Sequence, residues 1–110
     1  MRSILKTLGI GLVAISGLAI SNVTVAADGG TLYTQKLCNT CHGADAKTPI
    51  QPIYPKLAGQ NAEYLAAQTK DIKDKKRTNG QSGTMVPFTM SLTDDDIKAI
   101  SEWIAAQPVQ

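Results

Sequence analysis

The sequence has few residues that bind metals and no long hydrophobic run. Its 110 residues include only one histidine and two cysteines. A structural zinc site takes about four ligands, so these three residues fall short of one. The longest apolar run, Leu8 to Ile20, has 13 residues. A membrane-spanning helix needs about 20, so this run is short for one. No internal repeat or low-complexity segment occurs, which excludes repeat architectures.

The first 27 residues have the layout of an export signal. Two positive residues precede the apolar run, and small residues ending in Ala26-Ala27 follow it. This order is typical of a secretory signal peptide with its cleavage site. We therefore predict a cleaved signal peptide at residues 1–27 and one domain at residues 28–110. An uncleaved amino-terminal anchor is the alternative.

Removal of that segment changes the charge balance. The whole chain has eleven Lys and Arg residues and nine Asp and Glu residues, a net charge of +2. Arg2 and Lys6 lie in the predicted signal peptide, so nine basic and nine acidic residues remain. No excess of positive charge then indicates nucleic acid or an anionic membrane as a partner. Export also places the chain in an oxidising compartment, where free thiols do not persist.

One short motif indicates the chemistry. Cys38 and Cys41 are three positions apart, and His42, the only histidine, follows directly. The pattern Cys-x-x-Cys-His is the attachment site of a c-type haem. Each thiol can add to one haem vinyl group, and the imidazole can then reach the iron from one face. With no second histidine, bis-histidine ligation within the chain is excluded.

The two cysteines also have alternative interpretations. A redox dithiol of the thioredoxin type needs a βαβ context, and no strand pattern flanks the motif. A structural disulfide in a haem-free domain is the other alternative. A domain of about 80 residues has a thin core, and a haem would supply the apolar body that such a core lacks.

The remaining sequence predicts helices joined by loops, and no strand is required. Asn61 is a suitable N-cap, and Thr93 with Asp96 forms a capping-box pair before the best-defined helix. Pro49, Pro52 and Pro55 exclude a regular helix between the motif and Asn61. The predicted order is a short helix at 31–37, a proline-containing loop at 43–59, a helix at 61–74, a polar loop at 75–83, a connector at 84–92 and a terminal helix from 93 that Pro108 stops.

Three further stretches indicate a family. Tyr54 to Gln60 reads YPKLAGQ, Tyr64 to Gln68 reads YLAAQ, and Leu92 to Ile97 reads LTDDDI. With the haem motif, they resemble the class I monohaem cytochromes c of the small bacterial periplasmic type. The first stretch is also similar to a segment in each half of the tandem dihaem bacterial cytochromes c. The resemblance implies an all-α class I cytochrome c fold, with about three to five helices wrapped around one covalently attached haem.

The resemblance implies roles for individual residues. Cys38 and Cys41 form the thioethers of haem c, and His42 binds the iron. The backbone carbonyl of Pro55 accepts the hydrogen bond that fixes the His42 ring. The loop residue Gly59 is expected at a close backbone approach or at positive φ. No catalytic residue is predicted.

The sixth iron ligand is predicted to be Met85. After removal of the signal peptide, Met85 and Met90 are the remaining methionines, and both lie before the terminal helix. The resemblance favours Met85, which lies seven residues before Leu92. Met90 is predicted to fill a gap in the core. An open or water-bound iron is the remaining alternative.

Two groups of residues have structural as well as functional interpretations. The first is a basic cluster, which is either a solvated helix end or a docking patch for an acidic partner. Within it, the resemblance places Arg77, with Asn79, at a haem propionate. The second group is Gly29, Gly30 and Tyr33, which are expected to pack against Ile100 and Trp103 as the terminal helices meet. The basic cluster consists of Lys70, Lys73, Lys75, Lys76 and Arg77.

These features predict a periplasmic one-electron carrier. A thioether ligand raises the reduction potential of haem iron, and a fully ligated iron leaves no room for a substrate. We therefore expect no enzyme activity and no small-molecule substrate. The expected partners are membrane or periplasmic redox proteins, and the chain is expected to be a monomer or weak dimer. The alternatives are a cytochrome subunit of a larger dehydrogenase or oxidase complex and an open-site haem sensor.

Overall fold

The computed structural model describes residues 28–110, which fold into five α-helices without a strand in that range. The predicted signal peptide lies outside the described residues. Within them, no helix is both long and apolar enough to cross a membrane. The all-α prediction is confirmed. The helices are α1 (Gly29–Gln35), α2 (Asn39–His42), α3 (Ala62–Lys73), α4 (Ser82–Thr89) and α5 (Asp94–Ala105).

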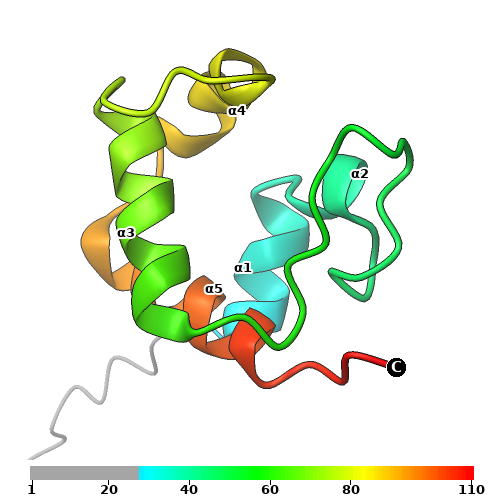
Figure 1. Ribbon diagram of the computed structural model, residues 1–110. Helices are drawn as coiled ribbons and strands as arrows, with labels where there is room; N and C mark the ends of the chain where they lie inside the picture. The colour runs from blue at the N-terminus through cyan, green and yellow to red at the C-terminus, as the bar shows by residue number, and fades with distance from the viewer. Residues whose placement is uncertain (1–27) are drawn as a thin grey trace, which may run out of the picture.

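The terminal helix α5 packs against both α1 and α3, and α4 packs against α3 (Figure 1). The apolar face of α5 enters the core through Ile97, Ile100 and Ile104, each less than 8 % exposed. Leu32 from α1 and Leu65 from α3 join the same core cluster. Full burial of each such side chain contributes roughly 1.5–3 kcal/mol.

The contact of α1 with α5 depends on glycine. A Cβ atom at Gly29 would collide with the carbonyl oxygen of Ala99, and one at Gly30 would meet the indole of Trp103. The ring centroids of Tyr33 on α1 and Trp103 on α5 lie 4.9 Å apart. Trp103 is half-buried at the edge of the core. The predicted packing of the terminal helices is therefore confirmed.

The predicted helix starts are also confirmed. The side chain of Asn61 accepts hydrogen bonds from the backbone N–H groups of Glu63 and Tyr64 at the start of α3. Thr93 and Asp96 form a reciprocal capping box at the start of α5. Such a cap contributes about 1 kcal/mol, and it sets where each helix begins.

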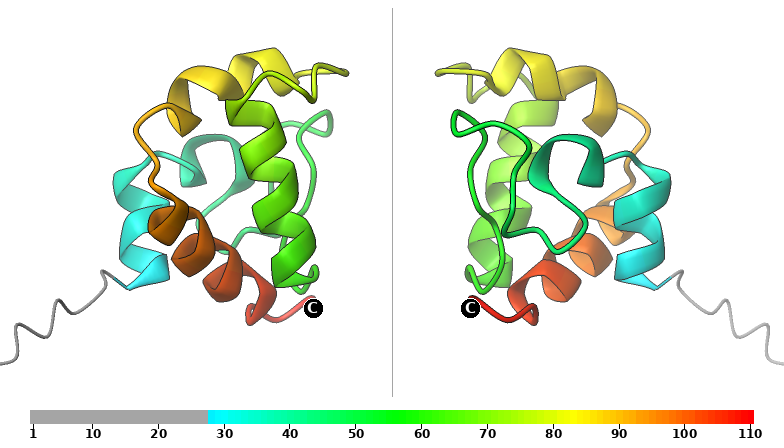
Figure 2. Two further views of the ribbon diagram at one scale, coloured as in Figure 1. Left: turned by 90° about the vertical axis from the view of Figure 1, so that its left-hand side faces the viewer. Right: turned by 90° about the vertical axis from the view of Figure 1, so that its right-hand side faces the viewer.

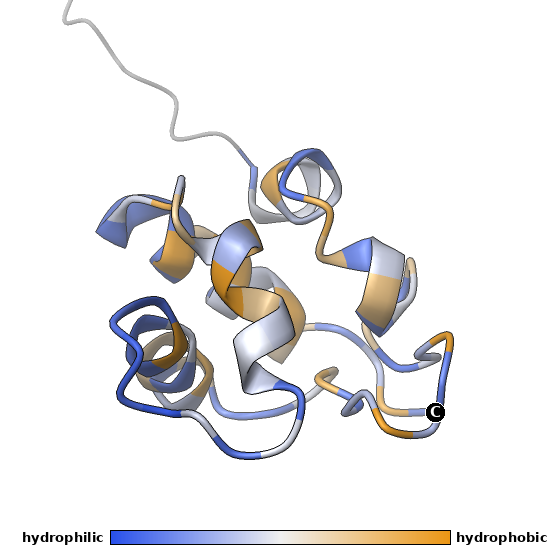
Figure 3. Ribbon diagram, turned by 90° about the horizontal axis from the view of Figure 1, so that it is seen from above, coloured by the Kyte–Doolittle hydropathy of each residue, from blue (hydrophilic) through white to orange (hydrophobic). Residues whose placement is uncertain are grey.

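The predicted connector at 84–92 is wrong, because most of it forms α4. Pro87 lies inside this helix. A proline removes one intrahelical hydrogen bond, here the bond that residue 87 would donate to Gly83. The helix nevertheless forms and packs against α3, and its sequence includes the apolar residues Met85, Val86 and Phe88. Figure 3 shows the contrast between these residues and the hydrophilic segment that precedes them.

The loop from α2 to α3 folds back on itself. Its crossing point is Ala46, which is fully buried and has a φ of 59°. The carbonyl oxygen of Ala46 accepts hydrogen bonds from the N–H groups of Leu57 and Ala58 at 2.8 and 3.0 Å. Both side views show the loop beside α2 (Figure 2). The crossing fixes the arc that carries Pro55.

Candidate functional site

A cavity of about 450 Å³ lies between α2 with its following loop on one side and α3 with α4 on the other. Its volume falls in the roughly 300–1,000 Å³ range of cofactor and ligand pockets. Ile97, Ile100 and Ile104 of α5 contribute to its lining. The same residues that form the core therefore also form an apolar wall of the cavity.

Cys38, Cys41 and His42 all line one side of this cavity, called here the proximal wall. The short helix α2 brings them to one surface, since the second cysteine and the histidine lie within its four residues. The turn before it is tight, because Leu37 has a φ of 64°. The structure thus places together the three residues of the haem motif.

The ring of His42 is fixed by the loop. Its Nδ1 lies 3.0 Å from the carbonyl oxygen of Pro55, and the residue is only 8 % exposed. A carbonyl can only accept, so Nδ1 carries the proton and Nε2 keeps a free lone pair. This is the partner that the family resemblance implies for the ring. Such an acceptor fixes the orientation and raises the basicity of a metal-binding histidine.

Burial and hydrogen bonding act in opposite directions on His42. Desolvation lowers the pKa of the imidazole and outweighs the raising effect of the Pro55 carbonyl. The ring is therefore neutral at physiological pH, the form that binds metals.

The two thiols are half-buried and free. Burial raises the pKa of Cys38 to about 11. A thiol of that kind stays protonated at neutral pH, whereas a redox dithiol needs an accessible thiolate of lowered pKa. The environment of Cys38 therefore does not favour the interpretation as a redox dithiol.

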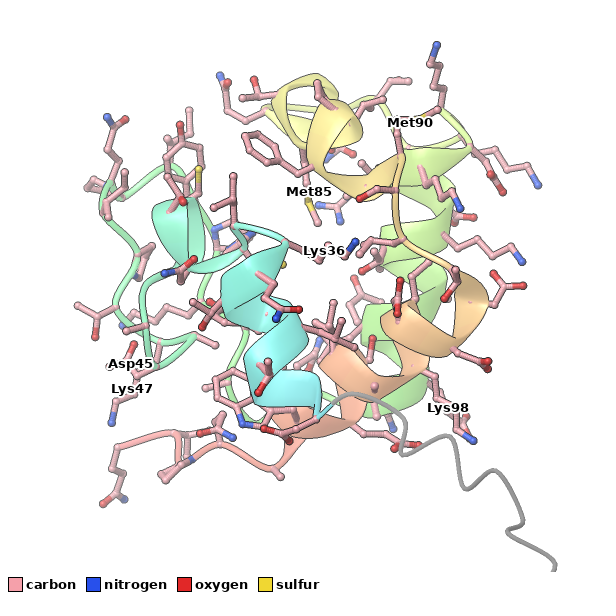
Figure 4. The ribbon with its side chains drawn as sticks, turned by 180° about the vertical axis from the view of Figure 1, so that it is seen from behind. Lys36, Asp45, Lys47, Met85, Met90 and Lys98 are labelled. Atoms are coloured by element: carbon pink, nitrogen blue, oxygen red, sulfur yellow. The ribbon has the colours of Figure 1, made fainter. Side chains whose placement is uncertain are left out.

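Met85 lines the opposite side of the cavity, called here the distal wall. It lies on α4 and is half-buried, and its side chain points toward the interior (Figure 4). Thr89, one helical turn later, lines the same cavity and is 1 % exposed. Two potential axial ligands, His42 and Met85, thus face one cavity from different elements.

The prediction that Met90 fills a gap in the core is wrong. Met90 is 58 % exposed and does not line the cavity. It is the C-cap residue of α4, and five positions after Met85 it lies on another side of the helix. The helical form of this segment, which the sequence did not indicate, is the physical reason for the difference.

Two cations and no carboxylate line the cavity. Lys56 and Arg77 are the charged residues of the lining. The Nε of Arg77 donates to Oδ1 of Asn79 at 3.3 Å, and both residues line the cavity. An apolar cavity with cations and without acids suits a flat apolar molecule that carries carboxylates. Lys56, the residue after Pro55, was not singled out from the sequence.

These residues fit a covalently attached haem. The proximal wall offers two thiols and a neutral imidazole, the distal wall a thioether, and the lining two cations for the propionates. Among residues 28–110, no three His, Cys, Asp or Glu side chains could hold a metal by themselves. The fold and site together define the class of all-α c-type haem proteins.

The comparisons agree with this class. Residues 26–107 match the cytochrome c family model. A cytochrome c4 of Pseudomonas aeruginosa is 40 % identical over 96 % of this chain and 46 % of its own length. A cytochrome c-554(548) of Halomonas halodenitrificans is 39 % identical over 64 % of this chain and 83 % of its own. The chain belongs to the cytochrome c family, whose members carry electrons and are not enzymes.

Two further relatives extend the comparison. A thiosulfate dehydrogenase electron acceptor of Stutzerimonas stutzeri is 34 % identical over 88 % of this chain and 47 % of its own length. The crystal structure of reduced recombinant cytochrome c4 from Pseudomonas stutzeri has a TM-score of 0.56 and 29 % identity, and the match covers 73 % of this chain and 44 % of that one. The chain thus spans about half the length of several relatives and resembles one half of a two-domain cytochrome c4. This structural match confirms the predicted class I cytochrome c fold.

The basic cluster divides into two parts. Lys70 forms an ion pair with Asp94 at 3.2 Å, and Lys73 donates to the carbonyl of Leu92. An exposed ion pair such as Lys70–Asp94 contributes only about 0–1 kcal/mol. Together with the hydrogen bond of Lys73, however, it directs these two lysines toward the start of α5. Lys75 and Lys76 are exposed and have no hydrogen bond from their ammonium groups to the described residues.

Proposed function

We propose that this chain is a periplasmic one-electron carrier with one haem c. Cys38 and Cys41 form its thioethers, and His42 and Met85 bind the iron. The observation that carries the proposal is that these four residues line one apolar cavity from two opposed walls. The bound haem would supply reversible one-electron chemistry at its iron.

The protein's own residues set the conditions for that chemistry. Pro55 keeps the His42 ring in one tautomer and orientation, so Nε2 stays available to the metal. The thioether of Met85 is a soft ligand that favours ferrous iron and raises the reduction potential. The lining residues Leu65, Leu92 and Ile100 are buried and would give the haem an apolar surrounding. With His42 and Met85 both bound to the iron, no coordination position would stay open for a substrate.

A second candidate function is that of a dedicated electron acceptor of a dehydrogenase. A relative named as the electron acceptor of thiosulfate dehydrogenase favours it. In that case the chain would bind one enzyme tightly rather than exchange electrons with several redox proteins. Co-purification from the native source separates the two: a stable complex with a dehydrogenase supports the second candidate, and a free monomer supports the first.

The visible spectrum of the ferric protein tests the ligand set. The protein is expressed with its own leader in a host that attaches c-type haem, and it is recovered from the periplasmic fraction. We expect a low-spin spectrum with the weak red band of methionine–iron charge transfer. A high-spin spectrum without that band would replace the carrier by an open-site haem protein. A colourless protein would reject haem attachment altogether, and mass spectrometry of the same sample locates the mature amino terminus.

A further inference from the structure

The residues after α5 run back along the loop between α2 and α3. Figures 1 and 2 show this segment in red, beside the end of the green loop. Its start is fixed to α5, because the side-chain Nε2 of Gln107 donates to the carbonyl of Trp103 at 2.8 Å. Residues 107–110 are called the brace below.

The first contact of the brace is with Gly59. This glycine has a φ of 75°, and a Cβ atom there would collide with the side chain of Val109. The N–H of Gly59 also donates to the carbonyl of Ile104 in the last turn of α5, at 3.1 Å. The prediction for Gly59 is a close backbone approach or a positive φ. The structure has the positive φ, and the group that lies close to Gly59 is the side chain of Val109.

The second contact is with Lys47. Its Nζ donates to the backbone carbonyl of Gln110. The backbone of Lys47 is fixed in turn, since its N–H donates to Oδ1 of Asp45 at 3.0 Å. Figure 4 shows Asp45 and Lys47 together on the loop.

These two contacts flank the crossing point of the loop. Lys47 directly follows Ala46, whose carbonyl accepts the two hydrogen bonds of the crossing. Gly59 directly follows Ala58, which donates one of them at 3.0 Å. The two segments that meet at the crossing are called its arms. The brace thus contacts each arm at the residue that directly follows the crossing in the chain, Lys47 on one arm and Gly59 on the other. The arc between the arms contains Pro55, whose carbonyl lies 3.0 Å from Nδ1 of His42.

We infer that the brace positions the Pro55 carbonyl on the His42 ring, with Val109 and Lys47 as positioning residues. Release of the brace lets the arms separate and weakens the hydrogen bond to Nδ1–H. A weaker acceptor makes the imidazole a poorer donor to a metal, which disfavours ferric iron and raises the reduction potential. This effect on iron rests on the proposed function, whereas the effect on the loop does not.

The test uses the full chain as purified with its haem. Val109→Asp replaces the contact on Gly59 by a charge, and the milder Lys47→Ala removes one donor. In both variants we expect amide hydrogen exchange at Ala58 and Gly59 to quicken, by about tenfold in Val109→Asp. We also expect the ratio of reduced to oxidised protein at a fixed potential to rise about threefold, which is about 28 mV at 59 mV per tenfold for one electron.

Three matched variants separate positioning from general damage. Val109→Ile keeps hydrocarbon on Gly59, and Lys47→Arg keeps the donor, so both should restore the exchange rate and the potential. Lys98→Ala removes a lysine on the far side of the molecule (Figure 4) and should change neither.

Two results would overturn the inference. One is faster exchange confined to the brace itself, with Ala58 and Gly59 unchanged. The other is a lowered thermal midpoint in Val109→Asp with no change in potential, which would make the contact merely stabilising. The exchange measurement needs no signal from iron, so a protein without bound haem would reject the proposed function while the effect on the loop is still measured.

Discussion

The two walls of the cavity are built in different ways. The proximal wall is specified by the backbone: His42 bonds to Pro55, the loop crosses at Ala46, and the hydroxyl of Tyr33 donates to the carbonyl of Gly43 at 2.6 Å. On the distal wall, Met85 lies on an eight-residue helix, α4, whose N-cap makes no side-chain hydrogen bond. It depends on packing against α3.

This difference suggests a division of roles. A histidine ligand needs one ring orientation, which several directional hydrogen bonds can impose. A methionine ligand has three rotatable bonds and adapts to its surroundings, so packing suffices to place it. We therefore expect changes on the distal wall to have the larger effect on the reduction potential, and changes on the proximal wall to act mainly on the stability and rigidity of the fold, with smaller effects on the potential.

The largest expected effect comes from the distal ligand. Met85→Ala removes the thioether, and we expect the reduction potential to fall by on the order of 0.1–0.3 V, within the span of about 0.8 V that axial ligands cover. The iron should then also bind added small ligands. A spectroelectrochemical titration measures the first effect, and spectra with added imidazole measure the second.

Met90→Ala is the matched control for that experiment. Met90 is exposed and lies outside the cavity, so its loss should leave the potential and the methionine band unchanged. If the potential is unchanged in Met85→Ala and shifts in Met90→Ala instead, Met90 is the ligand and the assignment to Met85 is wrong.

The next effect concerns the proximal wall. Tyr33 is fully buried, and Tyr33→Phe deletes the hydroxyl that bonds to Gly43. The same carbonyl keeps a hydrogen bond from the N–H of Ala46, so the loss should be moderate. We expect the free energy of unfolding to fall by about 0.5–1.5 kcal/mol, with little change in potential. Denaturant unfolding measures the first quantity.

Tyr64→Phe removes the same group from a tyrosine that is 52 % exposed. It should change the free energy of unfolding by no more than about 0.5 kcal/mol. Equal losses in the two variants would mean that the hydrogen bond to Gly43 contributes nothing specific.

Much of the fold followed from local sequence signals. The haem motif, the Asn61 cap and the capping box of Thr93 with Asp96 are each encoded within five residues. The apolar face of α5 repeats at helical spacing over Ile97, Ile100 and Ile104. Signals of this kind act through nearest neighbours along the chain, so no knowledge of the tertiary structure is needed to interpret them.

The parts of the structure that were not predicted from the sequence depend on contacts between separate elements of the fold. The packing of α4 on α3 overrides Pro87, and the exposure of Met90 follows only once that helix is known. The place of Lys56 in the cavity lining depends on the crossing at Ala46, a buried non-glycine residue at positive φ. Such a conformation is uncommon and has no sequence signature. The residues of the site were thus easier to name than the walls that support them.

A smaller effect is expected at the basic cluster, beside the distal wall. If Lys75 and Lys76 attract acidic partners, the reduced protein should react faster with an anionic oxidant such as ferricyanide at low salt. Charge steering of this kind raises association rates by 10- to 10³-fold in strong cases. For two exposed lysines we expect Lys75→Gln with Lys76→Gln to slow the reaction severalfold, as measured by stopped-flow spectroscopy.

The matched control changes Lys70 and Lys73, which already have internal partners. Their replacement by glutamine should slow the reaction less than loss of Lys75 and Lys76. A rate that does not change with salt in the unaltered protein would leave the cluster as a solvated helix end. A neutral oxidant should show no salt dependence in any variant.

The smallest expected effect concerns the loss of unfolding free energy at acidic pH that comes from Asp45, on the loop of the proximal wall. Asp45 accepts hydrogen bonds from the N–H of Lys47 and from the N–H and hydroxyl of Thr48, at 2.9–3.0 Å. These bonds, that of Lys47 first, hold the pKa of the Asp45 carboxyl below its usual range. The stabilisation is therefore complete above the unfolded-state pKa of about 3.9 and is lost as the pH falls through the lower folded-state value.

Asp45→Asn keeps an acceptor oxygen but removes this titration. We expect the variant's free energy of unfolding to depend less steeply on pH below about 4, with the brace contact at Lys47 loosened slightly at neutral pH. Asp74→Asn, at the exposed C-cap of α3, removes a carboxylate that accepts no hydrogen bond from the described residues and serves as the control for the loss of one negative charge. Parallel acid slopes for the unaltered protein and Asp45→Asn, measured by thermal unfolding between pH 2 and 6, would show that the Asp45 turn does not support the proximal wall through its charge.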